Sequence, residues 1–284
     1  MFTPTNKLID LLPYFKEKLT DLYGEREVEN MFYWCCEAQY GLSKIEVRIG
    51  EQRLSESELL EIRQVVKRLE KSEPFHYIIG ETEFFDCRIK VDNNVLIPRP
   101  ETEELVAWVL ESLNNHEQLL DIGTGSGCIP IAIKKNAPRL NVFALDVSPE
   151  ALNMAKASSN LNQVDIHFVE KDILQEDLAD LPKFDVIISN PPYVLESDKT
   201  QMNTNVLKFE PHLALFVADE DPLLFYKRIG ILGLEQLNPK GFLFFEIHES
   251  FGKETKIMLE ELGYQYVQVK SDMQGKDRMI RCQL

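Results

Sequence analysis

The segment of this sequence best suited to chemistry is Asn190-Pro-Pro-Tyr193. The side-chain oxygen of Asn190 and the backbone carbonyl of Pro191 can both accept hydrogen bonds from one planar NH2 group, in a carboxamide or a nucleic acid base. Pro192 has no N–H and stiffens the backbone, and Tyr193 could stack on the flat group. Because such a nitrogen is a poor nucleophile, positioning it toward an incoming methyl group would be the main catalytic device. The alternative is a plain Pro-Pro turn with a packed tyrosine.

A glycine-rich turn, Asp121-Ile-Gly-Thr-Gly-Ser-Gly127, lies earlier in the chain. Glycine lets a ligand approach the backbone closely. A dinucleotide fingerprint would need glycine or alanine at position 128, where Cys128 stands. The tighter G-x-G-x-G spacing instead favours a cofactor without a pyrophosphate, such as S-adenosylmethionine. The residues of the turn that we expect to bind this cofactor are Gly123, Thr124, Gly125, Ser126 and Gly127.

Two aspartates follow the glycine turn at suggestive positions. Asp146 lies 23 residues after Gly123, where an acidic side chain can accept hydrogen bonds from both ribose hydroxyls. Asp172 could accept from an adenine amino group, as a carboxylate does from the amino group of cytosine. The alternative is that the glycines only make a tight turn and the aspartates only cap helices.

The elements that must position these residues follow from hydrophobic periodicity. From about residue 118 the pattern is strand, turn, helix, repeated, which predicts a mostly parallel sheet covered on both faces. The two strands expected last are too close together for a helical crossover, so one edge should be an antiparallel hairpin. Ligands bind beyond the carboxyl ends of the strands in such a sheet, where the glycine turn, both aspartates and Asn190 fall. The expected strands are 119–122, 142–145, 166–169, 186–188, 242–247, 264–270 and 278–283, with helices such as 149–160 and 222–237.

Three domains or linkers are expected along the chain. Residues 1–75 carry apolar side chains at helical spacing and a Ser55/Glu58 capping-box pair, so they predict a small helical bundle that docks the substrate. Within residues 76–97, apolar side chains alternate from Phe85 to Val91, Asp92-Asn-Asn94 supplies turn residues, and Val95-Leu-Ile97 resumes an apolar run. This pattern predicts a β-hairpin linker with its turn at 92–94. Residues 98–284 would form the catalytic domain. Within it, the weakly periodic segment 194–217 could be a lid or surface filler.

Composition excludes several classes of protein. Among 284 residues, 31 Lys and Arg against 47 Asp and Glu give a net charge of −16, which argues against a protein that grips nucleic acid through phosphates. No apolar run approaches the roughly 18 residues of a membrane span, and the first residues lack a signal-peptide core. The five cysteines and five histidines are scattered without metal-ligand spacing. We therefore expect a cytoplasmic, metal-free protein.

Four segments together resemble one known family. The chain is similar to the S-adenosylmethionine-dependent protein-(glutamine-N5) methyltransferases, and within them to the branch specific for bacterial release factors. The Asn-Pro-Pro-Tyr element is shared with amino-methyltransferases of DNA and RNA, whereas the segment Ile97–Glu103 is much more discriminating. The segments are Ile97-Pro-Arg-Pro-Glu-Thr-Glu103, Leu120–Gly127, Ser189–Tyr193 and Phe209-Glu-Pro-His-Leu-Ala-Leu215.

This resemblance implies a fold, a reaction and a set of residues. The fold is α/β, a Rossmann-like class I methyltransferase sheet with a small amino-terminal helical bundle. S-adenosylmethionine is the cofactor, S-adenosylhomocysteine the product, and the substrate is the glutamine of the Gly-Gly-Gln loop of peptide chain release factors. Asn190, Pro191 and Tyr193 are the expected catalytic residues, and Pro192 joins them in binding the substrate. The glycine turn, Asp146, the Asp172–Ile173 region and Asn190 are the expected cofactor contacts.

Other functions stay open at this point. The same loop would serve an amino-methyltransferase acting on another protein glutamine, such as one in a ribosomal protein, or on a nucleic acid base. A non-catalytic helical docking module on a cofactor-sensing domain is a third interpretation. For the leading one we expect a monomer with release factors as partners, without direct contact to nucleic acid or membrane. His248, where family members often have glycine, is expected to be a packed or surface histidine and not a base.

Overall fold

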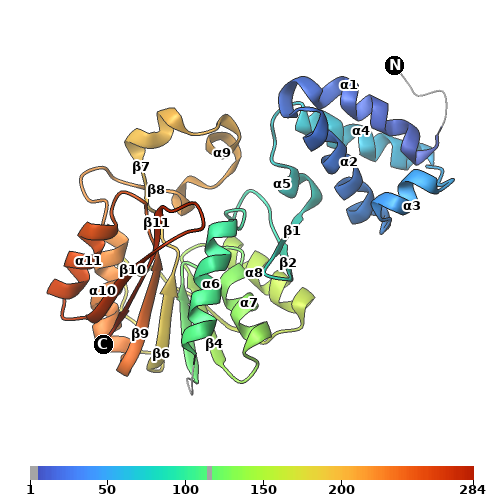
Figure 1. Cartoon of the computed structure of the whole chain (residues 1–284). Helices are drawn as coiled ribbons and strands as arrows, with labels where there is room; N and C mark the ends of the chain where they lie inside the picture. Colours follow the sequence, from blue (N-terminus) through green and yellow to red (C-terminus); the bar gives the residue numbers. More distant parts are fainter. Residues whose placement is uncertain (1–5, 114–116) are drawn as a thin grey trace. The chain divides into compact units, whose positions relative to one another are not determined.

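The computed structural model describes residues 6–113 and 117–284. The chain divides into two compact units (Figure 1). Each unit has its own cluster of buried hydrophobic residues. The first unit runs to Gly80 and includes Thr204–Phe209, whereas the second comprises Glu81–Asn203 and Glu210–Leu284. The division at Gly80 falls inside the segment 76–97, which we expected to be a linker. That segment begins with a short helix, α5 (Phe75–Ile79), and not with a strand.

The first unit is a helical bundle, as predicted. Phe15 and Phe32 meet edge to face at its centre, with ring centroids 5.2 Å apart, and both are buried. The capping box expected at Ser55 is present: its hydroxyl accepts from the Glu58 backbone N–H, and the Glu58 carboxylate accepts from the Ser55 N–H. The helices of this unit are η1 (Leu8–Leu11), α1 (Leu12–Tyr23), α2 (Glu25–Tyr40), α3 (Lys44–Ile49), α4 (Glu56–Leu69), α5 and α9 (Thr204–Phe209).

The predicted β-hairpin exists, but the predicted position of its turn is wrong. Strands β1 (Glu81–Phe84) and β2 (Cys87–Lys90) pair antiparallel, so the turn of the hairpin lies at Phe85 and Asp86. A turn also forms at 92–94, where the Val95 N–H donates to the Asp92 carbonyl at 3.2 Å, but it follows the hairpin. Both residues of the hairpin turn have left-handed φ angles, +48° and +58°, as a two-residue hairpin loop requires. Glu103 accepts from the Phe85 backbone N–H at 3.1 Å. The segment 95–97, expected to continue as a strand, is irregular.

The second unit is built on the predicted sheet. Its order is β10-β11-β9-β6-β3-β4-β5 among the described residues, with parallel pairing from β9 to β5 and antiparallel pairing of β11 with β9 and β10. The antiparallel edge hairpin expected at the carboxyl end is therefore confirmed. The strands are β3 (Gln118–Ile122), β4 (Asn141–Asp146), β5 (His167–Glu170), β6 (Phe184–Ser189), β9 (Leu237–Glu246), β10 (Gln265–Ser271) and β11 (Asp277–Gln283).

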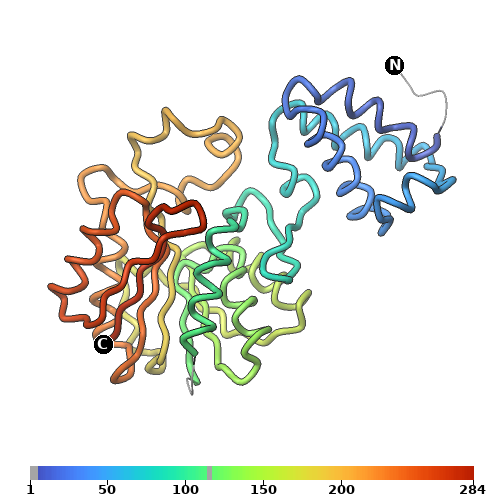
Figure 2. Tube along the Cα trace, viewed as in Figure 1, coloured from blue at the N-terminus to red at the C-terminus, as the bar shows by residue number. Residues whose placement is uncertain are grey.

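Helices cover both faces of this sheet. The trace in Figure 2 follows α6, α7 and α8 on one side and α10 and α11 on the other. Tyr226, Phe245 and their neighbours form a buried core between α10 and the sheet. None of the described helices is long and apolar enough to cross a membrane. The helices are α6 (Pro100–Ser112), α7 (Cys128–Asn136), α8 (Pro149–Asn162), α10 (Leu224–Gln236) and α11 (Gly252–Glu261).

The segment after β6 has more regular structure than its sequence pattern indicates. Strand β7 (Val194–Leu195) pairs in parallel with β8 (Phe216–Val217). Between them lie the short helices η2 (Glu196–Gln201) and η3 (His212–Ala214), with α9 between these two in the sequence. The β7–β8 pairing holds the two ends of this segment together in the second unit.

Candidate functional site

A cavity of about 280 Å³ opens at the carboxyl ends of β3, β4 and β6, within the second unit. This is the place where an open α/β sheet binds its ligands. The cavity brings together most of the residues that we selected from the sequence. The predicted residues on its wall are Gly123, Thr124, Gly125, Ser126, Asp146, Asp172, Ile173, Asn190, Pro191 and Pro192.

The glycine turn leaves open space beside its backbone. Gly123 and Gly125 have left-handed φ angles of +74° and +54°, and a Cβ added at either would meet no other described atom within 4 Å. The N–H groups of Gly123 and Thr124 both donate to the Leu145 carbonyl at 2.9 Å, which ties the turn to β4. A ligand can therefore lie directly against this turn.

Gly127 differs from the other two glycines because it allows close helix packing and does not leave open space beside the turn. A Cβ at this position would lie 2.9 Å from the Cβ of Ala155 on α8. The missing side chain lets α7 pack closely on α8. Gly127 thus supports the site from behind and does not line the cavity.

Asp146 lies at the end of β4 and is held in place by backbone groups. Its Oδ2 accepts from the Gly125 N–H at 2.8 Å and its Oδ1 from the Ser148 N–H at 3.0 Å. Burial raises the pKa of Asp146, and these two N–H groups partly offset that rise. A carboxylate has about four lone-pair positions, so Asp146 can still accept two hydroxyl groups from a ligand in the cavity.

Asp172 has both of the positions that the sequence left open: it caps a turn, and it lines the cavity. Its Oδ1 accepts from the Leu174 N–H at 2.9 Å and so caps the turn that follows β5. The same residue lines the cavity, next to the buried side chain of Ile173. Because Oδ1 is the oxygen that caps the turn, Oδ2 of Asp172 can accept from a donor on a ligand. Ile173 offers an apolar contact for a flat ring.

Asp121, in the glycine-rich segment, is a site residue to which our interpretation gave no role. It is fully buried, and neither carboxylate oxygen has a hydrogen-bond partner among the described residues. Burial raises its pKa to about 7. The nearby Thr124 hydroxyl lowers that pKa somewhat, although the two groups do not meet hydrogen-bond geometry. An acidic residue between Leu120 and Ile122 in a buried strand was the signal in the sequence.

These features fit S-adenosylmethionine. The open glycine turn can receive a ligand without pyrophosphate, and Asp146 can accept from its ribose hydroxyls. The Thr124 hydroxyl is an unpartnered polar group on the cavity wall, and the Asp121 carboxyl behind it favours a cationic ligand. Asp172 and Ile173 suit the polar edge and the face of a base.

The Asn190 side chain belongs to a chain of hydrogen bonds. Its Nδ2 donates to the Thr102 hydroxyl at 3.3 Å, and that hydroxyl donates to Glu246 Oε2 at 2.6 Å. The Tyr193 hydroxyl donates to the other oxygen, Oε1, at 3.0 Å. Glu246 and Thr102 are both buried. We did not expect this role for either one, although a glutamate closing the apolar run of β9 is a visible signal.

The Tyr193 hydroxyl points to this carboxylate, and Tyr193 is not among the residues that line the cavity. Its ring packs on the core of the second unit and lies edge-on to His248, with centroids 6.0 Å apart. His248 is half-buried between Tyr193 and Phe251, and burial lowers its pKa. Its Nδ1 accepts from the Ser250 N–H at 3.1 Å. Of the two positions expected for His248, packed or on the surface, the structure shows the packed one. Stacking of Tyr193 on a substrate stays a prediction.

No group of three or more His, Cys, Asp or Glu side chains within the described part of the chain has an arrangement that could hold a metal ion. Each of the five cysteines is buried as a free thiol. Burial raises the pKa of Cys35 and Cys128 to about 12, so these thiols stay protonated and unreactive near neutral pH.

Comparison with known proteins identifies the family. Residues 102–210 match the model "Methyltransferase small domain". A release factor glutamine methyltransferase of Flavobacterium psychrophilum is 46% identical over 94% of this chain and 95% of its own length. The enzyme of the same name from Bacteroides thetaiotaomicron is 42% identical over 94% and 96%.

Solved structures agree at the level of the fold. A methyltransferase from Pyrococcus furiosus has a TM-score of 0.52 at 17% identity, covering 81% of this chain and 98% of its own. The hMettl16 catalytic domain, solved with a 3'UTR hairpin, has a TM-score of 0.55 at 19% identity, covering 80% and 82%. With close relatives aligned over nearly its whole length, the chain belongs to the release factor glutamine methyltransferase family.

Proposed function

We propose that this protein transfers a methyl group from S-adenosylmethionine to the side-chain amide nitrogen of the glutamine in the Gly-Gly-Gln loop of peptide chain release factors. The observation that carries this proposal is that a single cavity is lined both by the glycine turn with its aspartates and by Asn190–Pro192. A cofactor and a planar amide would therefore meet in one cavity. The names of the relatives support the substrate.

The proposed division of the cavity follows from the groups on its wall. Asp146 would accept from the ribose hydroxyls, Asp172 from the adenine amino group, and Ile173 would contact the base. The remaining cofactor contacts would come from the backbone and side chains of Gly123, Thr124, Gly125 and Ser126, with Gly127 shaping the turn and Asn190 at the substrate end. When bound, S-adenosylmethionine supplies a methyl group activated by a sulfonium sulfur.

Asn190 and Pro191 would hold the substrate amide. The Asn190 Oδ1 and the Pro191 carbonyl each accept one N–H of the glutamine NH2, which orients the nitrogen lone pair toward the methyl group. Pro192 keeps the backbone rigid because its φ is fixed. Neither acceptor is basic, so the surplus proton on nitrogen leaves to solvent. In this scheme Tyr193 acts through its hydroxyl and its packing.

The partners follow from the same scheme. We propose a cytoplasmic monomer whose partner is a release factor protein, without direct contact to nucleic acid or membrane. The net charge of −16 supports this choice because a nucleic acid backbone would be repelled. We also propose that residues 1–75 dock the release factor, that 76–97 link the domains and that 98–284 carry the methyl transfer.

Mass spectrometry of a release-factor peptide tests this function. After incubation with the protein and S-adenosylmethionine, we expect a gain of one methyl group on the glutamine that follows two glycines. Asn190→Ala should abolish turnover while cofactor binding, measured by calorimetry, persists. Parallel reactions with ribosomes and with DNA provide the competing substrates. Methylation of either in preference to the peptide, or undiminished turnover by the variant, would contradict the proposal.

A further inference from the structure

We propose that Glu246 and Thr102 are positioning residues that decide which end of the Asn190 side-chain amide faces the substrate. Together they hold Nδ2 away from the cavity and present Oδ1 to it. This inference rests on the proposed function for its kinetic test, but its geometric basis is independent of the substrate. Thr102 and Asn190 line the cavity, and Glu246 is buried behind them.

The direction of each hydrogen bond follows from the chemistry of its atoms. An ionised carboxylate can only accept, so the Thr102 hydroxyl must donate to Glu246 across the 2.6 Å contact. A hydroxyl has a single proton, and this one is thereby used. Thr102 Oγ1 can only accept from Asn190, which places Nδ2 at the 3.3 Å contact. The amide oxygen of Asn190 must then point the other way and is available to an N–H donor.

The second oxygen of Glu246 strengthens the same arrangement. Tyr193 donates to Oε1 at 3.0 Å, and Thr102 donates to Oε2. Both oxygens of the buried carboxylate are therefore bonded either to the Asn190–Tyr193 loop itself or to the hydroxyl that binds its Asn190. Glu246 therefore fixes the first and the last residue of the Asn190–Tyr193 segment. The Ile97–Glu103 segment, which carried the family resemblance, contributes through Thr102.

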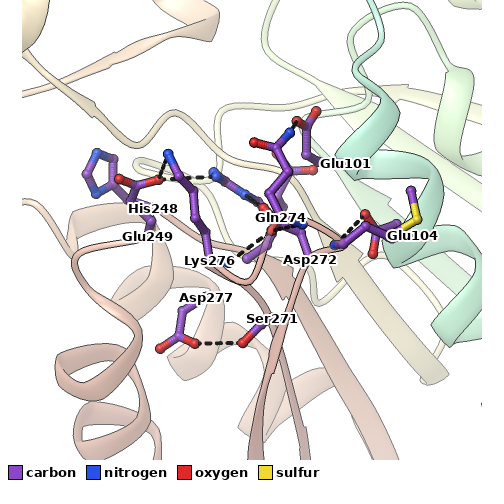
Figure 3. A network of polar contacts seen from close by, with 12 residues as sticks. Glu101, Glu104, His248, Glu249, Ser271, Asp272, Gln274, Lys276 and Asp277 are labelled. Carbon is purple, nitrogen blue, oxygen red and sulfur yellow. Dashed lines mark hydrogen bonds and ion pairs between the residues drawn. The ribbon is translucent and has the colours of Figure 1, made fainter.

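A polar cluster at the end of the β10–β11 hairpin holds a positive charge near Glu246. Arg278 on β11 donates through Nε to Asp272 at 3.2 Å, and its Nη2 lies 3.6 Å from Glu249. Figure 3 shows the adjacent contacts of this cluster, in which Lys276 faces Glu249 and Gln274 faces Glu101. The contacts with Asp272 and Glu249 keep Arg278 in place.

The surroundings of Glu246 determine its charge. Burial raises its pKa, whereas the hydrogen bonds from Thr102 and Tyr193 and the charge of Arg278 lower it, and Glu101 on α6 raises it again. Tyr226 on α10 and Cys128 on α7 also lie within the field of the carboxylate, and both are neutral near pH 7 because burial raises their pKa values. The result is a carboxyl that takes up a proton at a higher pH than an ordinary glutamate.

A proton on Glu246 would reverse the arrangement. A protonated carboxyl, or the amide of Glu246→Gln, can donate to Thr102 Oγ1. The hydroxyl would then be free to donate to Asn190 and to turn Nδ2 toward the cavity. There it would meet the NH2 group of the substrate, and two donors cannot bind each other. Methyl transfer should therefore fall on the acid side as Glu246 is protonated.

Kinetics of variants at Thr102 test the inference. Thr102→Val keeps the shape but removes the hydroxyl, so kcat should fall by about 10- to 100-fold while the KM for S-adenosylmethionine is unchanged. Thr102→Ser should restore most of the lost turnover. Thr255→Val is the matched control, because Thr255 is a buried helical threonine whose hydroxyl has no partner among the described residues. Its turnover should equal that of the wild type.

A spectroscopic measurement separates this inference from the proposed function. In protein labelled with 15N-asparagine, the Asn190 side-chain signal is identified by its loss in Asn190→Asp. We expect it to shift in Thr102→Val, to stay in Thr255→Val, and to move on acidification in the wild type but not in Glu246→Gln. An unmoved signal, or Thr102→Val with wild-type kcat, overturns the inference. Absence of methylation by the wild type refutes only the proposed function, because the signal still decides the orientation.

Discussion

Arg99 donates from one guanidinium nitrogen to both carboxylate oxygens of Glu210, at 2.7 Å each. The two residues are 111 positions apart in the sequence, and the pair connects the segment before α6 to the segment before η3. Arg99 and Pro211, which follows Glu210, both line the cavity. Glu210 is 4% exposed, and among the residues that the structure describes Arg99 is the ion-pair partner that compensates its charge.

Removal of the arginine should destabilise the second unit. Arg99→Ala leaves a buried carboxylate unpaired, and we expect the free energy of unfolding to fall by about 2 kcal/mol, less than for a fully buried pair because Arg99 is one-third exposed. The double variant Arg99→Ala with Glu210→Gln should recover most of this loss. Urea unfolding measures both. If Arg99→Ala were as stable as the wild type, Arg99 would not be the group that compensates the charge of Glu210.

Gly125 should be needed for cofactor binding and not only for folding. Gly125→Ala places a methyl group in the open space beside the turn and strains a residue at φ +54°. Gly263→Ala is the control: its φ is +103°, its surroundings are equally open, and it lies between α11 and β10. Both should lose about 1 kcal/mol of stability. Only Gly125→Ala should weaken S-adenosylmethionine binding, by more than tenfold in calorimetry, and equal affinities in the two variants would refute this.

The parts of this fold that depend on local pattern could be predicted from the sequence. Apolar runs located the strands, and the rule that ligands bind beyond strand ends placed Gly123, Asp146, Asp172 and Asn190 at one edge of the sheet. The structure brings these residues to the wall of one cavity. What they do there is still a prediction.

The parts that depend on distant contacts could not be predicted. The hairpin turn forms at Phe85–Asp86, where the Phe85 N–H donates to Glu103, 18 residues away. The better turn formers at 92–94 make a separate turn after the hairpin. Glu246 is connected to the site because it accepts a hydrogen bond from Thr102, 144 residues away in the chain. A single sequence shows a charged residue in an apolar strand but not which partner compensates it.

Cofactor affinity should depend on pH through Asp121. With a pKa of about 7, this carboxyl is largely ionised at pH 8 and largely protonated at pH 6. A cationic ligand beside it favours the ionised form, so affinity for S-adenosylmethionine should fall about tenfold between pH 8 and pH 6. Asp146 and Cys128 are the other titratable groups near it. Asp121→Asn should bind more weakly at pH 8 and lose this dependence, as followed by calorimetry.

The same group affects the stability of the cofactor-free protein in the opposite sense. The pKa of Asp121 is raised above its unfolded value, so its stabilising contribution is present at low pH and is lost as pH rises through about 7. Asp121→Asn should therefore melt at a higher temperature than the wild type at pH 8, with a smaller difference at pH 5. A variant that is less stable at pH 8 would show that the carboxylate has an unseen partner.

Tyr193→Phe distinguishes the hydroxyl of this residue from its ring. The hydroxyl donates to Glu246, and Tyr193 is not among the residues that line the cavity. We therefore expect the phenylalanine variant to lower kcat by about tenfold, whereas a stacking role would leave kcat intact. Tyr264→Phe is the matched control, because its buried hydroxyl donates to the Gly230 carbonyl at 2.8 Å, outside the site. Each variant should lose about 1 kcal/mol of stability in urea unfolding. Single-turnover methylation of the release-factor peptide then compares Tyr193→Phe with Tyr264→Phe. Equal kcat values in both variants would mean that Tyr193 has only a structural or stacking role.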